Sequence, residues 1–210
     1  MLFYTINESN IMKIRNQQDT ELQINDANNE QISLLNWLTL NGEKIENIKK
    51  VIENDIEKWL KTFDKDKLKF IVSCDSQRHG GRIVYVTTIV FIRKGFGGQG
   101  YYVREFSSIP GYNECEHNTK EKHKLVQSTI QRRLWNECVK AVKCALWLDT
   151  ILAKYDLHVE EIHEDINSNK KFKSNDMLKA IVGYIEAVGY KPVIKPDAWV
   201  ASTIADSKTK

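Results

Sequence analysis

Two acidic residues stand at the ends of segments that have the length of strands. Asp75 ends a nearly unbroken apolar run that starts at Lys69, and Asp165 lies at the end of a later predicted strand, 157–166. An apolar run such as the first is typical of a strand buried in the middle of a sheet, so Asp75 is expected at the mouth of the sheet, and Asp165 repeats this placement. Glu164 is the nearest rival of Asp165, and a turn-forming role is the structural alternative for Asp75.

Two further acidic residues are placed by helices. Glu137 falls inside the apolar arc of the long helix predicted over 120–154, plotted at about 100° per residue. A charged carboxylate there is costly unless it is paired, hydrogen-bonded or bound to a metal; pairing with a lysine is the structural alternative. Asp197 follows Pro196 at the start of the last helix, where it could be a cap. The helical plot turns Asp197 inward and Asp206 to the opposite side, which favours Asp197.

Together, Asp75, Glu137, Asp165 and Asp197 could converge on one cluster of like charges. Such a cluster does not hold itself together without a counter-charge. Mg²⁺ and Mn²⁺ suit an all-oxygen site, and two ions about 3.5–4 Å apart can clamp the attacking and leaving oxygens of a phosphoryl displacement. The four residues are therefore candidate metal ligands and catalytic residues, and the chemistry they indicate is phosphodiester hydrolysis by a metal-activated water.

The elements that would position these residues follow a definite order. Three β-rich segments joined by short turns predict an antiparallel meander, which is followed by helix, strand, helix, strand and helix. The glycine-rich stretch 95–100 is interpreted as the turn between the second and third strands. The pattern predicts the α/β class, with a mixed five-stranded sheet flanked by helices. The predicted elements are 69–75, 83–92, 101–106, 120–154, 157–166, 174–188, 190–195 and a helix after Pro196.

The beginning of the chain has a different character. Residues 1–33 are rich in Asn, Gln, Asp and Glu without a sustained period, which predicts a loosely ordered polar extension. Residues 34–66 contain Asn41-Gly42, a signal typical of a tight hairpin, and then an amphipathic helix expected to pack on the core. The main domain is expected over 67–210.

Composition describes an ordinary globular protein of 210 residues, with 41% hydrophobic and 28% charged residues. A net charge of +3 permits a polyanionic partner without requiring one. No apolar run reaches the ~18 residues of a membrane span, and the first residues show no secretory signal. Cys74, Cys115, Cys138 and Cys144 form no C-x-x-C pair, so a reduced, cytoplasmic compartment is expected and a zinc site is not.

Four parts of the chain carry a resemblance to a known family: Val72-Ser-Cys-Asp-Ser-Gln77, Arg133-Leu-Trp-Asn-Glu137, His163-Glu-Asp-Ile-Asn167 with Lys173-Ser-Asn175, and Lys195-Pro-Asp-Ala-Trp-Val-Ala-Ser-Thr-Ile-Ala-Asp206. In these segments the chain resembles the ribonuclease H-like superfamily and, within it, the YkuK-type family of RNase H-related nucleases. The resemblance implies a five-stranded sheet with flanking helices and a nuclease activity. It also implies Asp75, Glu137 and Asp165 as metal ligands, with Asp197 or Asp206 as a fourth.

Substrate contacts are suggested by a basic loop between Asp165 and the next helix. Lys170, Lys171 and Lys173 surround an aromatic residue just before a predicted helix N-terminus, an end that favours anions over lysines. A phosphate bound there would relieve the conflict, and Lys195 could extend the same basic rim. A solvated surface loop is the structural alternative.

The sequence therefore predicts a divalent-metal-dependent nuclease that hydrolyses phosphodiester bonds of RNA, an RNA–DNA hybrid or structured DNA. The alternative is a catalytically inactive nucleic-acid-binding module of the same fold. Intact carboxylates argue against that alternative, because a pure binder gains nothing from repelling phosphates. An ATPase-like domain would need a glycine-rich phosphate loop beside Asp75, and Ser76-Gln77 does not supply one.

Overall fold

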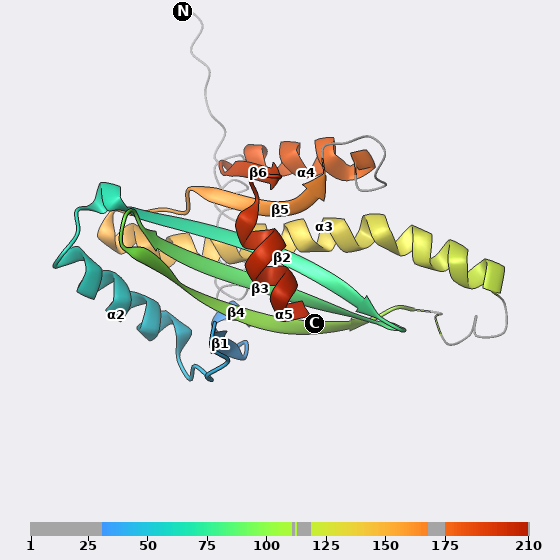
Figure 1. Ribbon diagram of the computed structural model, residues 1–210, viewed down its shortest axis with the longest axis horizontal. Coiled ribbons are helices and arrows are strands. Elements are labelled where there is room, and N and C mark those ends of the chain that lie inside the picture. Colours follow the sequence, from blue (N-terminus) through green and yellow to red (C-terminus); the bar gives the residue numbers. More distant parts are fainter. Residues whose placement is uncertain (1–30, 111, 113–118, 168–174, 210) are drawn as a thin grey trace, which may run out of the picture. The chain divides into compact units, whose positions relative to one another are not determined.

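A six-stranded mixed sheet in the order β1-β4-β3-β2-β5-β6 forms the centre of the structure (Figure 1). The computed structural model describes residues 31–110, 112, 119–167 and 175–209. Strands β1 to β4 are joined by antiparallel pairing, and β5 and β6 continue the sheet from β2 by parallel pairing. The strands are β1 (Trp37–Thr39), β2 (Leu68–His79), β3 (Arg82–Arg93), β4 (Gly97–Ser108), β5 (Glu161–Asn167) and β6 (Lys191–Lys195).

The predicted α/β class and the order of its strands and helices are confirmed, and the short strand β1 adds a sixth strand to the five expected. Residues 36–210 form one compact unit, which includes β1 and the helix that follows it. The predicted polar extension, 1–33, lies almost entirely outside the described residues.

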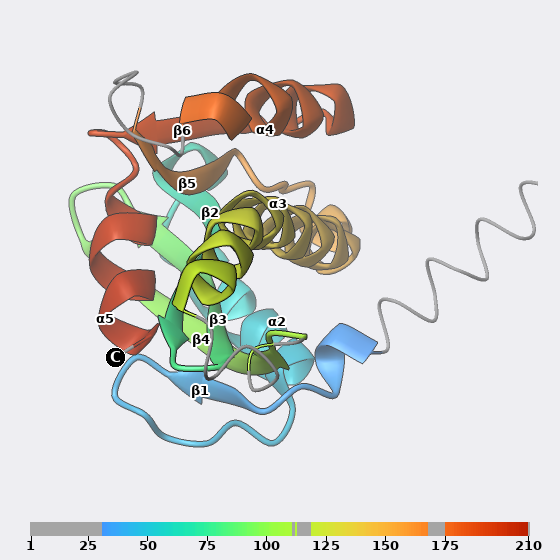
Figure 2. The same ribbon diagram turned by 90° about the vertical axis from the view of Figure 1, so that its right-hand side faces the viewer.

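Helices cover both faces of the sheet (Figure 2). Three lie on one face: α2 (Ile48–Leu60), α3 (Thr119–Leu152) and α4 (Asn175–Val188). The C-terminal segment, made of η3 (Val200–Ala205) and α5 (Asp206–Thr209), lies on the other. Two short 3₁₀ turns complete the described elements: η1 (Lys65–Lys67) and η2 (Ala153–Tyr155). No helix within the described residues is long and apolar enough to cross a membrane.

Helix α2 shows why the predicted pattern gives this packing. Asn47 caps its N-terminus by accepting a hydrogen bond from the Lys50 N–H at 2.9 Å. The buried face consists of residues three or four apart, and each fully buried isoleucine contributes about 1.5–3 kcal/mol through the hydrophobic effect. These buried residues are Ile48, Ile52, Ile56 and Trp59.

Strand β2 is longer than the sequence suggested. The expectation that Asp75 ends this strand is wrong, because β2 continues to His79 and pairs with β3 over its whole length. Its parallel pairing with β5, however, stops at Ser73↔His163. Asp75 therefore lies where β2 loses one neighbour but keeps the other, which opens the sheet beside this carboxylate.

The glycine-rich segment also differs from its interpretation as a turn. Strand β4 already begins at Gly97, and the turn itself is confined to the residues around Gly95 (φ +84°). A Cβ on Gly98 would come within 2.8 Å of the Phe91 carbonyl oxygen, so glycine permits close approach of the two strands.

The C-terminal segment was expected to be one regular α-helix, and that expectation is wrong in its geometry. Residues Val200–Ala205 form a π-helix, in which the Asp206 N–H donates to the Ala201 carbonyl oxygen five residues earlier. A π-helix takes more residues per turn than an α-helix. Side chains that follow it consequently point in other directions than a plot at 100° per residue gives.

Candidate active site

Asp75 and Asp165 occupy matching positions on neighbouring strands. Each lies two residues beyond the last parallel pair, Ser73↔His163, so both side chains leave the same face of the sheet. Asp75 is buried. Burial and the neighbouring Asp165 carboxylate raise the pKa of Asp75 from 3.8 to about 6. The two carboxylates are therefore electrostatic neighbours.

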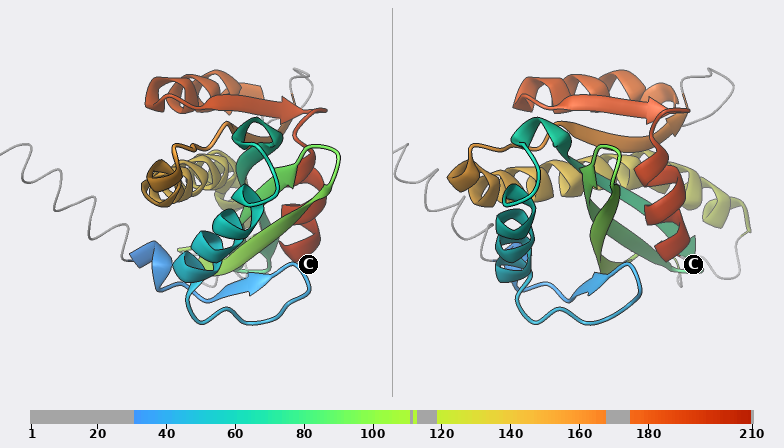
Figure 3. Two further views of the ribbon diagram at one scale, coloured as in Figure 1. Left: turned by 90° about the vertical axis from the view of Figure 1, so that its left-hand side faces the viewer. Right: turned by 60° about the vertical axis from the view of Figure 1, so that its left-hand side comes forward.

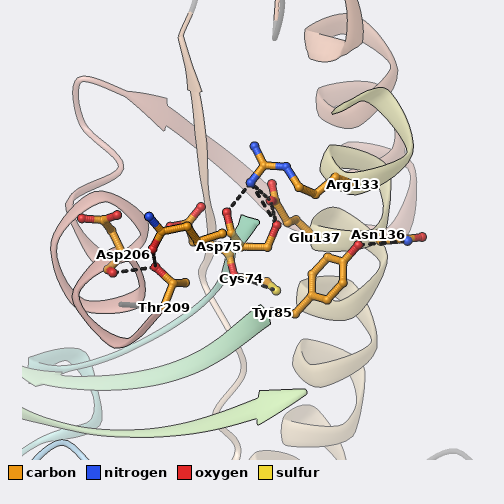
Figure 4. A network of polar contacts seen from close by, with 10 residues as sticks. Cys74, Asp75, Tyr85, Arg133, Asn136, Glu137, Asp206 and Thr209 are labelled. Carbon is orange, nitrogen blue, oxygen red and sulfur yellow. Dashed lines mark hydrogen bonds and ion pairs between the residues drawn. The ribbon is translucent and has the colours of Figure 1, made fainter. Parts of the chain in front are cut away.

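Glu137 reaches this region from α3, and its side chain is only 2% exposed. Its Oε1 accepts a hydrogen bond from Ser76 Oγ, and Arg133 Nη1, one helical turn earlier, lies 3.6 Å from the same oxygen (Figure 4). Burial raises the pKa of Glu137 to about 8; Arg133 opposes that rise, and Asp75 and Asp165 add to it. The expectation of a buried carboxylate in the apolar arc of the helix is confirmed.

The C-terminal segment brings a further carboxylate to Asp75. Near the start of this segment, Val200 packs on Ile71. Thr209, at its other end, donates from Oγ1 to Gln77 Oε1 (3.3 Å). Asp206 lies between these contacts, beside Asp75, and its charge contributes to the raised Asp75 pKa. In Figure 4, Asp206 and Glu137 flank Asp75 from opposite sides.

Asp197, by contrast, is exposed in the turn between β6 and η3. The expectation that it points inward is wrong, because the chain at Asp197 is still a turn: the Asp197 N–H donates to the Ile194 carbonyl oxygen at 3.0 Å. The helical conformation begins only at Trp199. The structure thus brings Asp206, which the helical plot had turned away, to the cluster instead of Asp197.

Glu164 is the most isolated carboxyl group near the cluster. It is fully buried, and neither of its oxygens has a hydrogen-bond partner among the described residues. Alternation along β5 puts it on the face opposite Asp165, toward α3. Burial, followed by the charges of Glu137 and Asp75, raises the pKa of Glu164 well above its usual value. Its place in the sequence marked it only as a rival of Asp165.

Lys195 is the one predicted phosphate-binding lysine within the described residues. Its Nζ forms an ion pair with Asp165 Oδ1 at 2.6 Å, and its side chain is partly exposed. A β-bulge in β5 between Glu164 and Asn167 lets β6 draw alongside Asp165 at this point. Lys170, Lys171 and Lys173 lie outside the described residues.

A second polar network fixes the base of β5. Glu161 pairs with Lys69 of β2 (2.7 Å) and Lys191 of β6 (2.8 Å), and its Oε2 lies 3.1 Å from His163 Nε2. Burial would raise the Glu161 pKa, but these partners outweigh it and lower the pKa to about 2. His163 Nδ1 accepts from the Val200 N–H at 3.4 Å, so Nε2 carries the proton of a neutral ring and β5 is tied to η3.

The donor set fits a divalent cation in its chemistry. The acidic groups that act on one another's pKa supply only carboxylate oxygens, the ligands that Mg²⁺ and Mn²⁺ prefer. Arg133 and Lys195 offset part of their charge. No three acidic, thiol or imidazole groups of the described residues already enclose a single ion position; Glu137 is engaged by Ser76 and Arg133. The acidic residues of this neighbourhood are Asp75, Glu137, Glu164, Asp165 and Asp206.

Comparison with curated proteins and with solved structures gave no match. The family model described as "Ribonuclease H-like" matches residues 50–210, which include all five acidic residues and every strand except β1. The match also agrees with the antiparallel-then-parallel sheet order and with the helices on both faces. The chain belongs to the ribonuclease H-like family.

Proposed function

We propose that this protein is a divalent-metal-dependent nuclease that hydrolyses phosphodiester bonds of RNA, an RNA–DNA hybrid or structured DNA. Family membership points to a nuclease or nucleic-acid-binding function. One observation carries the catalytic proposal: where β2 loses its parallel neighbour, the Asp165 charge adds to the raised pKa of Asp75, and the charges of Asp75 and Asp165 add to the raised pKa of Glu137. A cation is the simplest relief for that repulsion.

In this proposal Asp75, Asp165 and Asp206 hold the metal, with Glu137 completing the set. When bound, divalent cations of this kind neutralise phosphate charge and lower the pKa of water. Glu137, with a pKa raised to about 8, can hold or release a proton at its carboxylate near neutral pH.

Two positively charged side chains, Arg133 and Lys195, border the acidic residues and could bind the phosphates of a nucleic acid. Arg133 is anchored by its Nη1, which donates to the Ser76 carbonyl oxygen and contacts Ser76 Oγ at 3.2 Å. Lys195 reaches Asp165 from β6. Both side chains already offset the negative charge of neighbouring carboxylates. We infer that they also orient the phosphate backbone of the substrate and reduce its repulsion by the acidic residues. Lys170, Lys171 and Lys173 remain predicted phosphate contacts.

A cytoplasmic setting is part of the proposal. It is supported by Cys74, Cys138 and Cys144, which are buried free thiols, as expected in a reducing compartment.

A panel of labelled substrates tests the reaction and names its substrate. Single-stranded RNA, an RNA–DNA hybrid and a four-way DNA junction are incubated with the full chain in Mg²⁺, Mn²⁺ or EDTA. Cleavage of at least one substrate is expected in a divalent cation and none in EDTA. Binding of a substrate without cleavage in either metal would instead favour a nucleic-acid-binding module.

The choice between the two C-terminal aspartates gives a sharp prediction. Asp206→Asn should lower the cleavage rate on the order of a hundredfold, since it removes a negative charge from the centre. Asp197→Asn should leave the rate within about twofold, because Asp197 is exposed in a turn. Single-turnover rates of the two variants provide the comparison. A larger loss in Asp197→Asn than in Asp206→Asn would show that the C-terminal ligand is misassigned.

A further inference from the structure

The helix that carries Asp206 is too short to hold itself in place. Helix α5 (Asp206–Thr209) continues directly from η3 (Val200–Ala205), and an isolated helical segment of even this combined length is marginally stable in water. Its position must therefore come from contacts with the rest of the fold. This matters for Asp206 because the charge of Asp75, its neighbour, repels it.

Lys208 supplies several of these contacts. Its Nζ donates to the Leu40 carbonyl oxygen at 2.8 Å and lies 5.4 Å from the centre of the Tyr102 ring. Its carbonyl oxygen accepts from Arg104 Nε at 2.7 Å, and the Arg104 guanidinium lies over the same ring at 5.5 Å. Side chain and main chain of one residue are thus held from two directions.

The Leu40 carbonyl group that binds Lys208 belongs to the turn after β1. Strand β1 pairs with β4, with Leu38 opposite Tyr102. Leu38 and Leu40 pack against the apolar cluster of Val84, Val86 and Tyr102. Figure 3 shows β1 and its turn beside the end of the C-terminal segment. The Leu40 carbonyl group that receives Lys208 is consequently held by a packed strand.

A further pair of contacts fixes the last described residue. His79 Nε2 lies 3.0 Å from the Thr209 carbonyl oxygen, and Thr209 Oγ1 also donates to the Asp206 carbonyl oxygen at 2.7 Å. The extension of β2 beyond Asp75 therefore serves to dock α5.

We propose that the β1 turn and β4 position Asp206 for the cation through Lys208 and Arg104, which are positioning residues of the site. The proposal rests on the proposed function, because it takes Asp206 as a ligand. We refer to the contacts of Lys208 with Leu40 and Arg104 as the bracket. Strand β1 and its turn precede the region 50–210 that the family model matches, so part of the bracket lies outside that match.

Mn²⁺ affinity of the full chain, measured by titration calorimetry at pH 8 without nucleic acid, tests the bracket. Lys208→Met keeps the stem but removes the ammonium group, and it should weaken Mn²⁺ binding roughly tenfold or more. Lys208→Arg retains the charge and should recover most of the loss. Lys65→Met is the matched control: it removes a lysine that pairs with Asp156 at 3.2 Å, outside this bracket, and should change nothing.

A double-mutant cycle shows whether Lys208 acts through Asp206. In an Asp206→Asn background, Lys208→Met should have no further effect on Mn²⁺ affinity, so the two changes are not additive. An equal loss in both backgrounds would overturn the positioning role, as would unchanged affinity in Lys208→Met. If Asp75→Asn leaves Mn²⁺ binding intact, the proposed metal centre itself is overturned. If Mn²⁺ binding is lost in Asp75→Asn and in Asp206→Asn but not in Lys208→Met, only the bracket is overturned.

Hydrogen exchange supplies a measurement that needs no metal. Amides of residues 200–209 should exchange faster in Lys208→Met than in the wild type, while those of β3 stay protected. Equal exchange in both proteins would show that α5 is held without Lys208.

Discussion

Without metal, the protein should lose stability as the pH rises from about 4.5 to about 8, because Glu137 is forced to ionise in a buried site. Its pKa is 4.5 in the unfolded chain and about 8 in the fold, where burial is the main cause of the rise. Between these values the folded state binds a proton that the unfolded state has released, so the free energy of unfolding falls with rising pH. The contribution of Glu137 is complete below pH 4.5 and lost above pH 8. It amounts to about 5 kcal/mol, or roughly 10–20 °C in melting temperature.

The isosteric variant Glu137→Gln isolates this contribution. The amide oxygen can still accept from Ser76, but the side chain no longer ionises. Glu161 and His163, whose pKa values are lowered, change stability in the opposite direction, and they do so equally in both proteins. The difference between the two melting curves should therefore widen in favour of Glu137→Gln from pH 5 to pH 8.5. Parallel profiles would mean that Glu137 is not held in a proton-binding state.

Mg²⁺ or Mn²⁺ should reverse this loss, since ligands bind a cation in their ionised form. The rise in melting temperature on adding metal is expected to be larger at pH 8 than at pH 6, where Asp75 and Glu137 both retain protons. Glu137→Gln should show a smaller rise than the wild type at both pH values.

Replacing Glu164 by methionine should make the protein more stable by about 2 kcal/mol, or roughly 4–8 °C in melting temperature. Both Glu164 oxygens lack a hydrogen-bond partner among the described residues, and the side chain is fully buried. Burying such a group costs free energy in either protonation state, whereas a methionine of similar length would fill the same space with apolar atoms.

Glu164→Gln provides the matched control for this change. It keeps the shape and the unmet polar atoms of Glu164, so only the part of the cost that comes from charge should disappear. The order of melting temperatures at pH 8 should be Glu164→Met, then Glu164→Gln, then wild type. A destabilised Glu164→Met variant would show that the carboxyl group has a partner in the segments outside the described residues.

Local patterns in the sequence predict most of what positions Asp75, Glu137 and Asp165. The two-residue period of a strand places Asp165 on the face of His163, and the helical period buries Glu137. That Asp75 shares the face of Asp165 follows only from the parallel register Ser73↔His163. Both periods are properties of consecutive residues, so they can be read without knowing the fold. They do not reveal that β2 continues past Asp75, because the strand residues from Ser76 to His79 are polar and depend on pairing with β3.

The carboxylate at the C-terminus could not be chosen from local patterns. A plot at 100° per residue turns Asp206 away from the other carboxylates. Residues Val200–Ala205 form a π-helix, however, and no residue type in that segment predicts one. Asp206 is then held by Lys208 through Leu40 and Arg104, which are far away in the sequence. Leu38 pairs with Lys44 across the turn at Asn41-Gly42, as the hairpin signal predicts. The sequence does not show that β1 also joins the main sheet, because that depends on its pairing with β4.

Cleavage by wild-type protein and by Asp75→Asn, side by side in Mg²⁺ and in EDTA, tests the central claim most directly. Burial and Asp165 already disfavour the charge on Asp75, so its neutral isostere should fold with equal or greater stability, and lost activity cannot be attributed to unfolding. The account predicts metal-dependent cleavage by the wild type and a loss on the order of a thousandfold in the variant. Cleavage that persists in Asp75→Asn, or in EDTA, would contradict a metal centre built on this carboxylate.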